Sequence, residues 1–158
     1  MLEIGFGGGY LLGRMAAVVT QGFIAGVDIS EAMVAVCERR YQSLARAGRL
    51  DLRCAPVEML PYPSAYFNKA CTVNSLFYWS DALRALGEIY RVLEDGGRLV
   101  VYVTRKGSIE NKPFAAHGIG LYEDEEVCGM LERVGFGKVE MSKASDVHRE
   151  FICIIGRK

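Results

Sequence analysis

The chain has 158 residues, of which 51% are apolar and 24% are charged, with 19 basic and 19 acidic side chains. These proportions are typical of a globular protein, and the length predicts a single domain over residues 1–158 with a substantial core. A net charge of zero argues against a general nucleic-acid or anionic-membrane binder. The sequence has no uncharged apolar run of about 18 residues and no basic start, so we expect neither a membrane span nor a secretory signal.

A glycine-rich stretch, residues 3–9 (Glu-Ile-Gly-Phe-Gly-Gly-Gly), joins a short strand to the first predicted helix, residues 10–20. Glycine lets the backbone approach a ligand closely, and the free N–H groups of the following helix can bind negative or polar atoms. The stretch therefore indicates a nucleotide-binding turn, although an ordinary tight turn has the same composition. A second strand, residues 23–27, is followed by Asp28.

Capping residues and glycines predict two helices in the middle of the chain. Ser30 is the expected N-cap of a helix that ends near Gly48. A later helix begins at Ser80 or Asp81, carries an apolar stripe, and is expected to stop at Gly96-Gly97.

Hydrophobic patterning separates edge strands from interior strands. Residues 50–54 and 138–143 alternate between apolar and polar, which predicts edge strands with one wet face. The last predicted helix, residues 122–134, has an acidic first turn that we interpret as a solvated helix start. Alternating strands and helices, closed by two consecutive strands, predict a doubly wound α/β sheet with helices on both faces and an antiparallel pair at the end. Continuous apolar runs, which predict buried strands, occur at residues 70–73, 99–103 and 151–155.

The glycine loop and Asp28 both follow predicted strands, so the ligand is expected in the crevice above the carboxyl ends of the first and neighbouring strands. Asp28 lies about 20 residues after Gly5, the separation at which an acidic residue reaches ribose hydroxyls in dinucleotide folds. The alternative is a simple carboxylate at a helix N-terminus, and we favour the ribose role.

Five cysteines are scattered singly through apolar segments. Their odd count and irregular spacing argue against a disulfide framework and predict reduced core residues in a cytoplasmic protein. A reactive or metal-binding cysteine is the less favoured alternative, and no metal site is expected. They are Cys37, Cys54, Cys71, Cys128 and Cys153.

Over nearly its whole length the chain resembles the class I S-adenosylmethionine-dependent methyltransferases, in particular the compact branch related to ubiquinone and menaquinone biosynthesis. The resemblance rests on a Glu/Asp-x-Gly-x-Gly-x-Gly loop, an acid after the second strand, a Leu-Pro-Phe-like stretch with the next strand, an Arg-Val-Leu helix end with a Gly-Gly turn, and a late Gly-Phe. The residues that correspond to these five features are, in the same order, Glu3, Gly5, Gly7 and Gly9; Asp28; residues 58–62 and 67–70; residues 91–97; and Gly135-Phe136.

The resemblance implies a seven-stranded sheet of order 3-2-1-4-5-7-6 with an antiparallel last strand, and S-adenosyl-L-methionine as cofactor, with S-adenosyl-L-homocysteine as product. It assigns the glycine loop to the methionine end of the cofactor, Asp28 to the ribose hydroxyls, and Ile29 and residues 56–58 to the adenine. Asn74 and Ser75 would face the sulfonium. The cofactor-binding residues it implies are Glu3, Gly5, Phe6, Gly7, Asp28, Ile29, Pro56, Val57, Glu58, Asn74 and Ser75.

The chain departs from this family pattern in three places. Pro56 stands where many relatives have an acid that accepts from the adenine amino group, so we expect this bond to come from Glu58 or a backbone carbonyl. Phe67-Asn68 replaces a common Phe-Asp, a change expected in a solvated turn. Met1 already lies in the first strand, where relatives usually carry preceding helices, so we expect a truncated chain or a partner that supplies the cover, with reduced cofactor affinity and an open site.

Methyl transfer from a sulfonium needs alignment and exclusion of water more than it needs catalytic side chains. A hydroxyl or carbon acceptor would require a base, and the candidates are Tyr78, His117 and Asp81. His117 falls in a glycine-containing segment after the fifth strand, where a lid is expected, although a surface role is the commoner one. Phe77, Tyr78 and Trp79 form an aromatic cluster that is either a wall of the site or a plug of the core.

Three functions are compatible with the sequence. The favoured one is a methyltransferase that acts on a small-molecule acceptor, with self-association as a further possibility. The second is a non-catalytic S-adenosylmethionine-binding or interaction module. The third, a nicotinamide-dependent dehydrogenase, is disfavoured because Tyr10 occupies the place of the last glycine in Gly-x-Gly-x-x-Gly.

Overall fold

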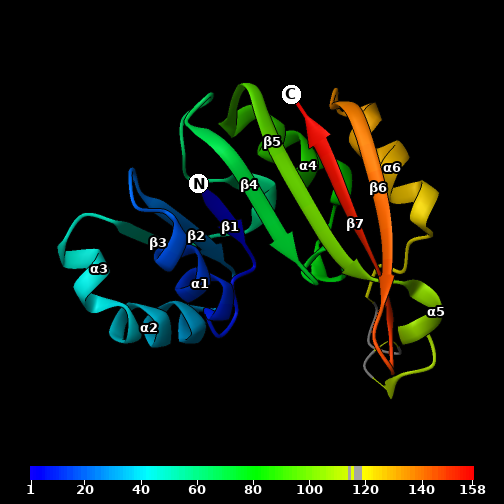
Figure 1. Cartoon of the computed structure of the whole chain (residues 1–158), viewed down its shortest axis with the longest axis horizontal. Helices are drawn as coiled ribbons and strands as arrows, with labels where there is room; N and C mark the ends of the chain where they lie inside the picture. Colours follow the sequence, from blue (N-terminus) through cyan, green and yellow to red (C-terminus); the bar gives the residue numbers. More distant parts are fainter. Residues whose placement is uncertain (114, 116–118) are drawn as a thin grey trace.

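The computed structural model describes residues 1–113, 115 and 119–158 (Figure 1). In this part of the chain seven strands form one sheet of order β3-β2-β1-β4-β5-β7-β6. The strands are β1 (Leu2–Ile4), β2 (Ile24–Asp28), β3 (Leu50–Cys54), β4 (Phe67–Val73), β5 (Leu93–Thr104), β6 (Gly137–Ser145) and β7 (Glu150–Arg157). The α-helices are α1 (Tyr10–Val18), α2 (Glu31–Arg40), α3 (Gln42–Arg46), α4 (Ala82–Val92), α5 (Lys106–Ile109) and α6 (Asp124–Arg133), and the 3₁₀ turns are η1 (Val57–Met59) and η2 (Leu76–Tyr78).

Strands β1 to β5 pair in parallel, and β7 runs antiparallel to both β5 and β6. The doubly wound α/β prediction and the order 3-2-1-4-5-7-6 are therefore confirmed. The two alternating segments, now β3 and β6, are the edges of the sheet. Every residue of β6 except Val139 is exposed, which explains why its sequence carries so many polar side chains.

Helices cover both faces of the sheet, and each face has its own core (Figure 1). Successive residues of a strand point to opposite faces, so Ile24 belongs to the core that includes α1 and α2, while its neighbour Ala25 belongs to the core that includes α4 and α6. In the same way, Ala70 of β4 belongs to the second of these cores and Cys71 to the first. Burial on both faces is the physical reason that the interior strands have continuous apolar sequences.

The helix expected between Ser30 and Gly48 is in fact two helices, α2 and α3, with a break at Tyr41. Tyr41 leaves the helical conformation, with φ of −110° and ψ of 25°, and its hydroxyl donates to the carbonyl of Gly9 at 2.7 Å. Its ring also packs under Gly13 of α1. A contact more than thirty positions away in the chain thus decides where this helix ends.

Helix α4 ends at Val92, before the Gly96-Gly97 pair that was expected to stop it, and β5 begins at Leu93. The Lys158 ammonium donates to the carbonyls of Tyr90 and Leu93 at 2.9 and 2.8 Å. These acceptors lie at the carboxyl end of α4, where carbonyls lack intrahelical partners. The chain's last residue therefore satisfies the end of this helix, and the glycines lie within β5.

The acidic first turn of α6 is only partly the solvated start that we expected. Glu123 and Glu126 form a capping box at the surface. Asp124 is instead 5% exposed, and its carboxylate pairs with Arg105 at 2.9 Å and Lys143 at 2.8 Å. This carboxylate fastens α6 to β6 and to the end of β5. No helix among the described residues has the length and apolar character needed to cross a membrane.

Candidate functional site

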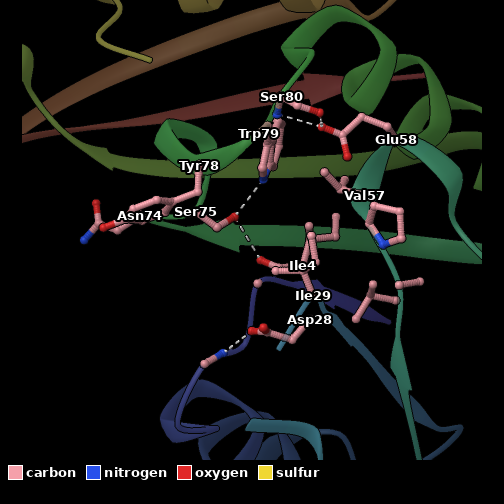
Figure 2. A pocket seen from close by; sticks show the side chains of 15 residues that line it. Ile4, Asp28, Ile29, Val57, Glu58, Asn74, Ser75, Tyr78, Trp79 and Ser80 are labelled. Carbon is pink, nitrogen blue, oxygen red and sulfur yellow. Dashed lines mark hydrogen bonds between the residues drawn. The ribbon is translucent and has the colours of Figure 1, made fainter. Parts of the chain in front are cut away.

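A cavity of about 350 Å³ opens at the carboxyl ends of β1, β2 and β4, where the sequence predicts the ligand (Figure 2). Its floor is the glycine loop after β1, and its other walls come from the segments that follow β2, β3 and β4. The lining residues are Ile4, Gly5, Gly7, Val27, Asp28, Ile29, Ala55, Pro56, Val57, Glu58, Asn74, Ser75, Tyr78, Trp79 and Ser80.

The glycine loop needs its glycines for two different reasons. Gly5 has a φ of 70°, and a Cβ on it would clash with the Cβ of Ser75, so only glycine lets β1 and the end of β4 approach this closely. Gly9 has a φ of 74°, and its Cβ would lie 2.6 Å from the Cys37 sulfur of α2. The first glycine thus shapes the cavity, and the second packs the loop on the helix beneath it.

The Asp28 carboxylate is fixed at the rim of the cavity by two backbone groups (Figure 2). Gly7 N–H donates to Oδ2 at 2.7 Å, and Ser30 N–H donates to Oδ1 at 2.9 Å. Each carboxylate oxygen has a second lone pair, which remains for the hydroxyls of a ligand. Asp28 therefore ties the glycine loop to the start of α2 and also presents an acceptor to the cavity, and its role toward ribose hydroxyls stays a prediction.

Ser75 is the centre of a hydrogen-bonded group on the opposite wall (Figure 2). Its hydroxyl donates to the Ile4 carbonyl at 3.3 Å, accepts from the Trp79 indole N–H at 3.2 Å and contacts the Thr72 hydroxyl. These bonds join β1, β4 and the aromatic segment that follows η2. The Trp79 ring is thereby held as a fixed wall of the cavity.

Glu58 joins η1 to the residues before α4. Its Oε1 accepts from Ser80 N–H and the Ser80 hydroxyl, both at 2.8 Å, and from Asp81 N–H at 3.2 Å. Although burial acts to raise it, the pKa of Glu58 is lowered overall by these hydrogen bonds and one from its own backbone N–H. Because Oε1 is occupied, an adenine amino group beside Pro56 would have to use Oε2 or a backbone carbonyl.

Glu3 and Phe6 do not line the cavity, although both were expected at the cofactor. Phe6 is 4% exposed and packs under Gly26 with its ring in the core between the sheet and helices α1 and α2. Glu3 is 3% exposed, and its Oε2 has no hydrogen-bond partner within the described residues. Burial, and next the charge of Asp28, raise the pKa of Glu3 to about 8.

The three base candidates are placed differently. Tyr78 is 68% exposed and lines the cavity, close to Asn74 and Ser75. The Asp81 carboxylate accepts from Arg84 N–H at 3.0 Å and is the N-cap of α4. His117 lies outside the described residues. Tyr78 is therefore the candidate that the described site brings to the cavity.

The aromatic cluster serves both of the uses weighed for it. Phe77 is a buried core residue, Tyr78 lies at the surface of the site, and Trp79 is buried and forms part of the cavity wall. Sequence reasoning missed Ile4, Val27, Ala55 and Ser80 as lining residues. Little in the sequence indicates that Ser80 and Ala55 line a cavity. A serine before a helix is interpreted as an N-cap, and an alanine after a strand belongs to no recognisable motif.

The profile described as "Methyltransferase domain" matches residues 2–101 of the chain. An uncharacterized methyltransferase, YdaC, of Bacillus subtilis is 31% identical over 101 residues, which are 64% of this chain and 54% of that protein. The ubiquinone/menaquinone biosynthesis C-methyltransferase UbiE of Geobacter sulfurreducens is 36% identical over 78 residues, 49% of this chain and 30% of that protein. The chain thus spans about half the length, or less, of these relatives.

Solved structures agree with the fold. Phosphoethanolamine N-methyltransferase 2 of Haemonchus contortus, in complex with phosphomonomethylethanolamine and S-adenosylhomocysteine, superposes with a TM-score of 0.85 at 17% identity, over 100% of this chain and 48% of that one. At this identity the likeness concerns the fold alone. The profile match, which covers most of the sequence, shows that the chain belongs to the class I S-adenosylmethionine-dependent methyltransferase family.

Proposed function

We propose that this chain binds S-adenosylmethionine in the cavity above β1, β2 and β4 and transfers its methyl group to a small-molecule acceptor. The observation that carries the proposal is the Asp28 carboxylate, fixed by Gly7 and Ser30 at the rim of a 350 Å³ cavity next to the glycine loop. Vicinal ribose hydroxyls can donate to its free lone pairs. Family membership supports the same cofactor.

The described residues fit the two ends of this cofactor. Ile29, with 76% of its surface exposed, offers an apolar contact for a base beside Asp28. At the other end, the buried and unpaired Oε2 of Glu3 lies in β1, directly before the cavity-lining residues Ile4 and Gly5. An ammonium group near this carboxyl would favour its ionised form. These features support placing the adenosine near Ile29 and the amino acid end near the glycine loop.

Bound S-adenosylmethionine supplies a methyl group that is already activated on a sulfonium. The protein's task is then to align the acceptor and to keep water out. Trp79, fixed through Ser75, forms a rigid apolar wall for this purpose. If the acceptor atom must lose a proton, Tyr78 is the base proposed within the described residues, and His117 is the second candidate.

Isothermal titration with S-adenosylhomocysteine tests the cofactor site. We expect binding with one-to-one stoichiometry that Asp28→Ala abolishes. Asp95→Ala, which removes an exposed carboxylate of β5, is the matched control and should bind as wild type does. No binding by the folded protein, or equal binding by the Asp28 variant, would overturn the proposed site. NADH in place of the homocysteine ligand should not bind.

A non-catalytic module that binds S-adenosylmethionine is the second candidate. The exposure of Ile29 and Tyr78 at the rim favours it, because an open site excludes water poorly. Turnover with any small acceptor would exclude this alternative. With such an acceptor, His117→Ala or Tyr78→Phe should lower turnover without weakening S-adenosylhomocysteine binding if that residue is the base, and unchanged turnover would remove it from consideration.

Three further expectations belong with this proposal. We propose that residues 1–158 act as one methyltransferase domain. All five cysteines are free, which supports a reducing compartment such as the cytoplasm. Cys54 is exposed and is therefore not the core residue that was expected. Self-association of the chain remains a prediction that sedimentation or light scattering would check.

A further inference from the structure

A second cavity, of about 300 Å³, adjoins the first at the carboxyl ends of β4 and β5. The two cavities share Asn74 and Tyr78, which Figure 2 shows among the residues that line the first cavity. A molecule in the second cavity would reach the first along these two side chains. If the first cavity holds the methyl donor, the second is placed to hold the acceptor. Its lining residues are Asn74, Phe77, Tyr78, Thr104, Ser108, Ile109, Lys112 and Arg149.

Asn74 presents a hydrogen-bond donor on the shared wall. Its Oδ1 accepts from Thr104 N–H at 2.8 Å and from the Thr104 hydroxyl at 3.2 Å, which fixes the amide and leaves its NH₂ group available. The backbone of Asn74 has a φ of 53°, a conformation rarely used by residues other than glycine. Rare backbone conformations are concentrated at functional sites, where the surrounding structure holds them.

Ser108, Lys112 and Arg149 add further donors to this lining. The Ser108 hydroxyl accepts from Glu150 N–H at 3.0 Å, so its proton is left to donate. Lys112 and Arg149 add two cationic groups. Arg149 is held in a tight turn in which its N–H donates to Asp146 Oδ1 at 2.8 Å.

The carboxylates near this cavity do not neutralise Lys112 and Arg149. Asp146 contacts the Arg149 guanidinium at 3.5 Å, but both side chains are more than a third exposed. Glu150 is paired instead with Arg105 at 2.8 Å. Neither carboxylate lines the cavity. Two cations, a free amide NH₂ and a hydroxyl proton therefore face a space with no described carboxylate on its wall.

We propose that this second cavity is the acceptor subsite and that it takes a small molecule with an anionic group, a carboxylate or a phosphate, bound by Lys112 and Arg149. Its apolar part would lie against Phe77 and Ile109, with the methyl-accepting atom toward Tyr78 and the first cavity. This inference rests on the proposed function, because it names the substrate class of the same site. Charge-assisted hydrogen bonds give such a pair of cations selectivity over a neutral analogue.

The test measures binding of three probes of similar shape: benzoate, phenyl phosphate and the neutral benzamide. Dissociation constants are obtained by ligand-observed NMR titration, with and without saturating S-adenosylhomocysteine, for the wild type, Lys112→Met and Arg149→Met. The matched control is Arg46→Met, which removes an exposed cation on α3.

We expect at least one anionic probe to bind about tenfold more tightly than benzamide, and each of the two cavity variants to lose about five- to tenfold of that affinity. Arg46→Met should bind like wild type. A preference for benzoate or for phenyl phosphate assigns the anionic group. Equal affinity for benzamide, or anion binding unchanged in both cavity variants, would overturn the inference. Anion binding that depends on Lys112 in a protein that does not bind S-adenosylhomocysteine would overturn the proposed function and leave the anion site standing.

Discussion

Replacing Glu3 by glutamine should stabilise the folded protein at neutral and alkaline pH. Glu3 is 3% exposed in β1, its Oε2 has no partner within the described residues, and burial together with Asp28 raises its pKa to about 8. Ionisation of this carboxyl therefore works against folding. Glutamine keeps the shape of the side chain and removes the ionisation.

The magnitude follows from the pKa. In the unfolded chain Glu3 loses its proton near its ordinary pKa of 4.5, whereas the folded protein keeps the proton up to about pH 8. The stabilising effect of this proton is therefore complete below pH 4.5 and is lost as the pH rises toward 8. One pKa unit corresponds to about 1.4 kcal/mol. Between pH 5 and pH 8 the wild type should thus lose about 3 kcal/mol of unfolding free energy relative to Glu3→Gln.

Urea unfolding of the wild type and Glu3→Gln at pH 5 and pH 8 measures this difference. Titrating groups that do not interact with Glu3 affect both proteins equally and cancel in the comparison. Glu140→Gln, on the exposed face of β6, is the matched control and should differ from wild type by the same amount at both pH values. A difference between Glu3→Gln and wild type that does not change with pH would refute the reasoning.

Gly5→Ala should lower the unfolding free energy by about 2 to 3 kcal/mol and abolish S-adenosylhomocysteine binding, whereas the control Gly8→Ala, whose Cβ would meet open space, should do neither. Phe6→Ala should cost about 3 kcal/mol in a urea titration with little change in ligand affinity, because its ring lies in the core. Glu58→Ala should cost about 2 kcal/mol at pH 7. Since the pKa of Glu58 is lowered, this cost should be present above pH 4.5 and shrink as the pH falls through that pKa. Calorimetry at pH 7 in buffers of different ionisation enthalpy should detect release of up to about one proton on ligand binding, from Glu3.

The order of strands and the placement of the cavity could be predicted because the signals are local. Continuous apolar runs mark strands buried on both faces, and alternating runs mark β3 and β6 at the edges. Asp28 and the glycine loop follow strands directly, so their positions depend only on the strands being parallel and adjacent. Each of these inferences needs the sequence of one segment and a general rule of sheet packing.

Element ends and side-chain partners could not be predicted in this way, because distant residues set them. Tyr41 breaks a helix by reaching Gly9, and Lys158 completes the end of α4. Glu58 lines the cavity where a ligand contact was expected, and in addition its Oε1 binds Ser80 and Asp81, which lie more than twenty positions away. Such contacts have no local pattern, since they depend on which loops the fold brings together.

Glu3, the first residue of the glycine-rich motif, does not stabilise the fold. A buried carboxyl beside a second carboxylate is unfavourable for folding, and a valine at this position would suit the interior strand better. Ionisation of Glu3 becomes less unfavourable once a cation binds beside Gly5, because the positive charge attracts the carboxylate even though Glu3 itself does not line the cavity. The proposed cofactor carries an ammonium group, so its binding would recover part of the free energy that the folded apo-protein loses. On this argument the conflict between Glu3 and its surroundings is itself a mark of the site, in line with the general finding that local rules are broken where function requires it.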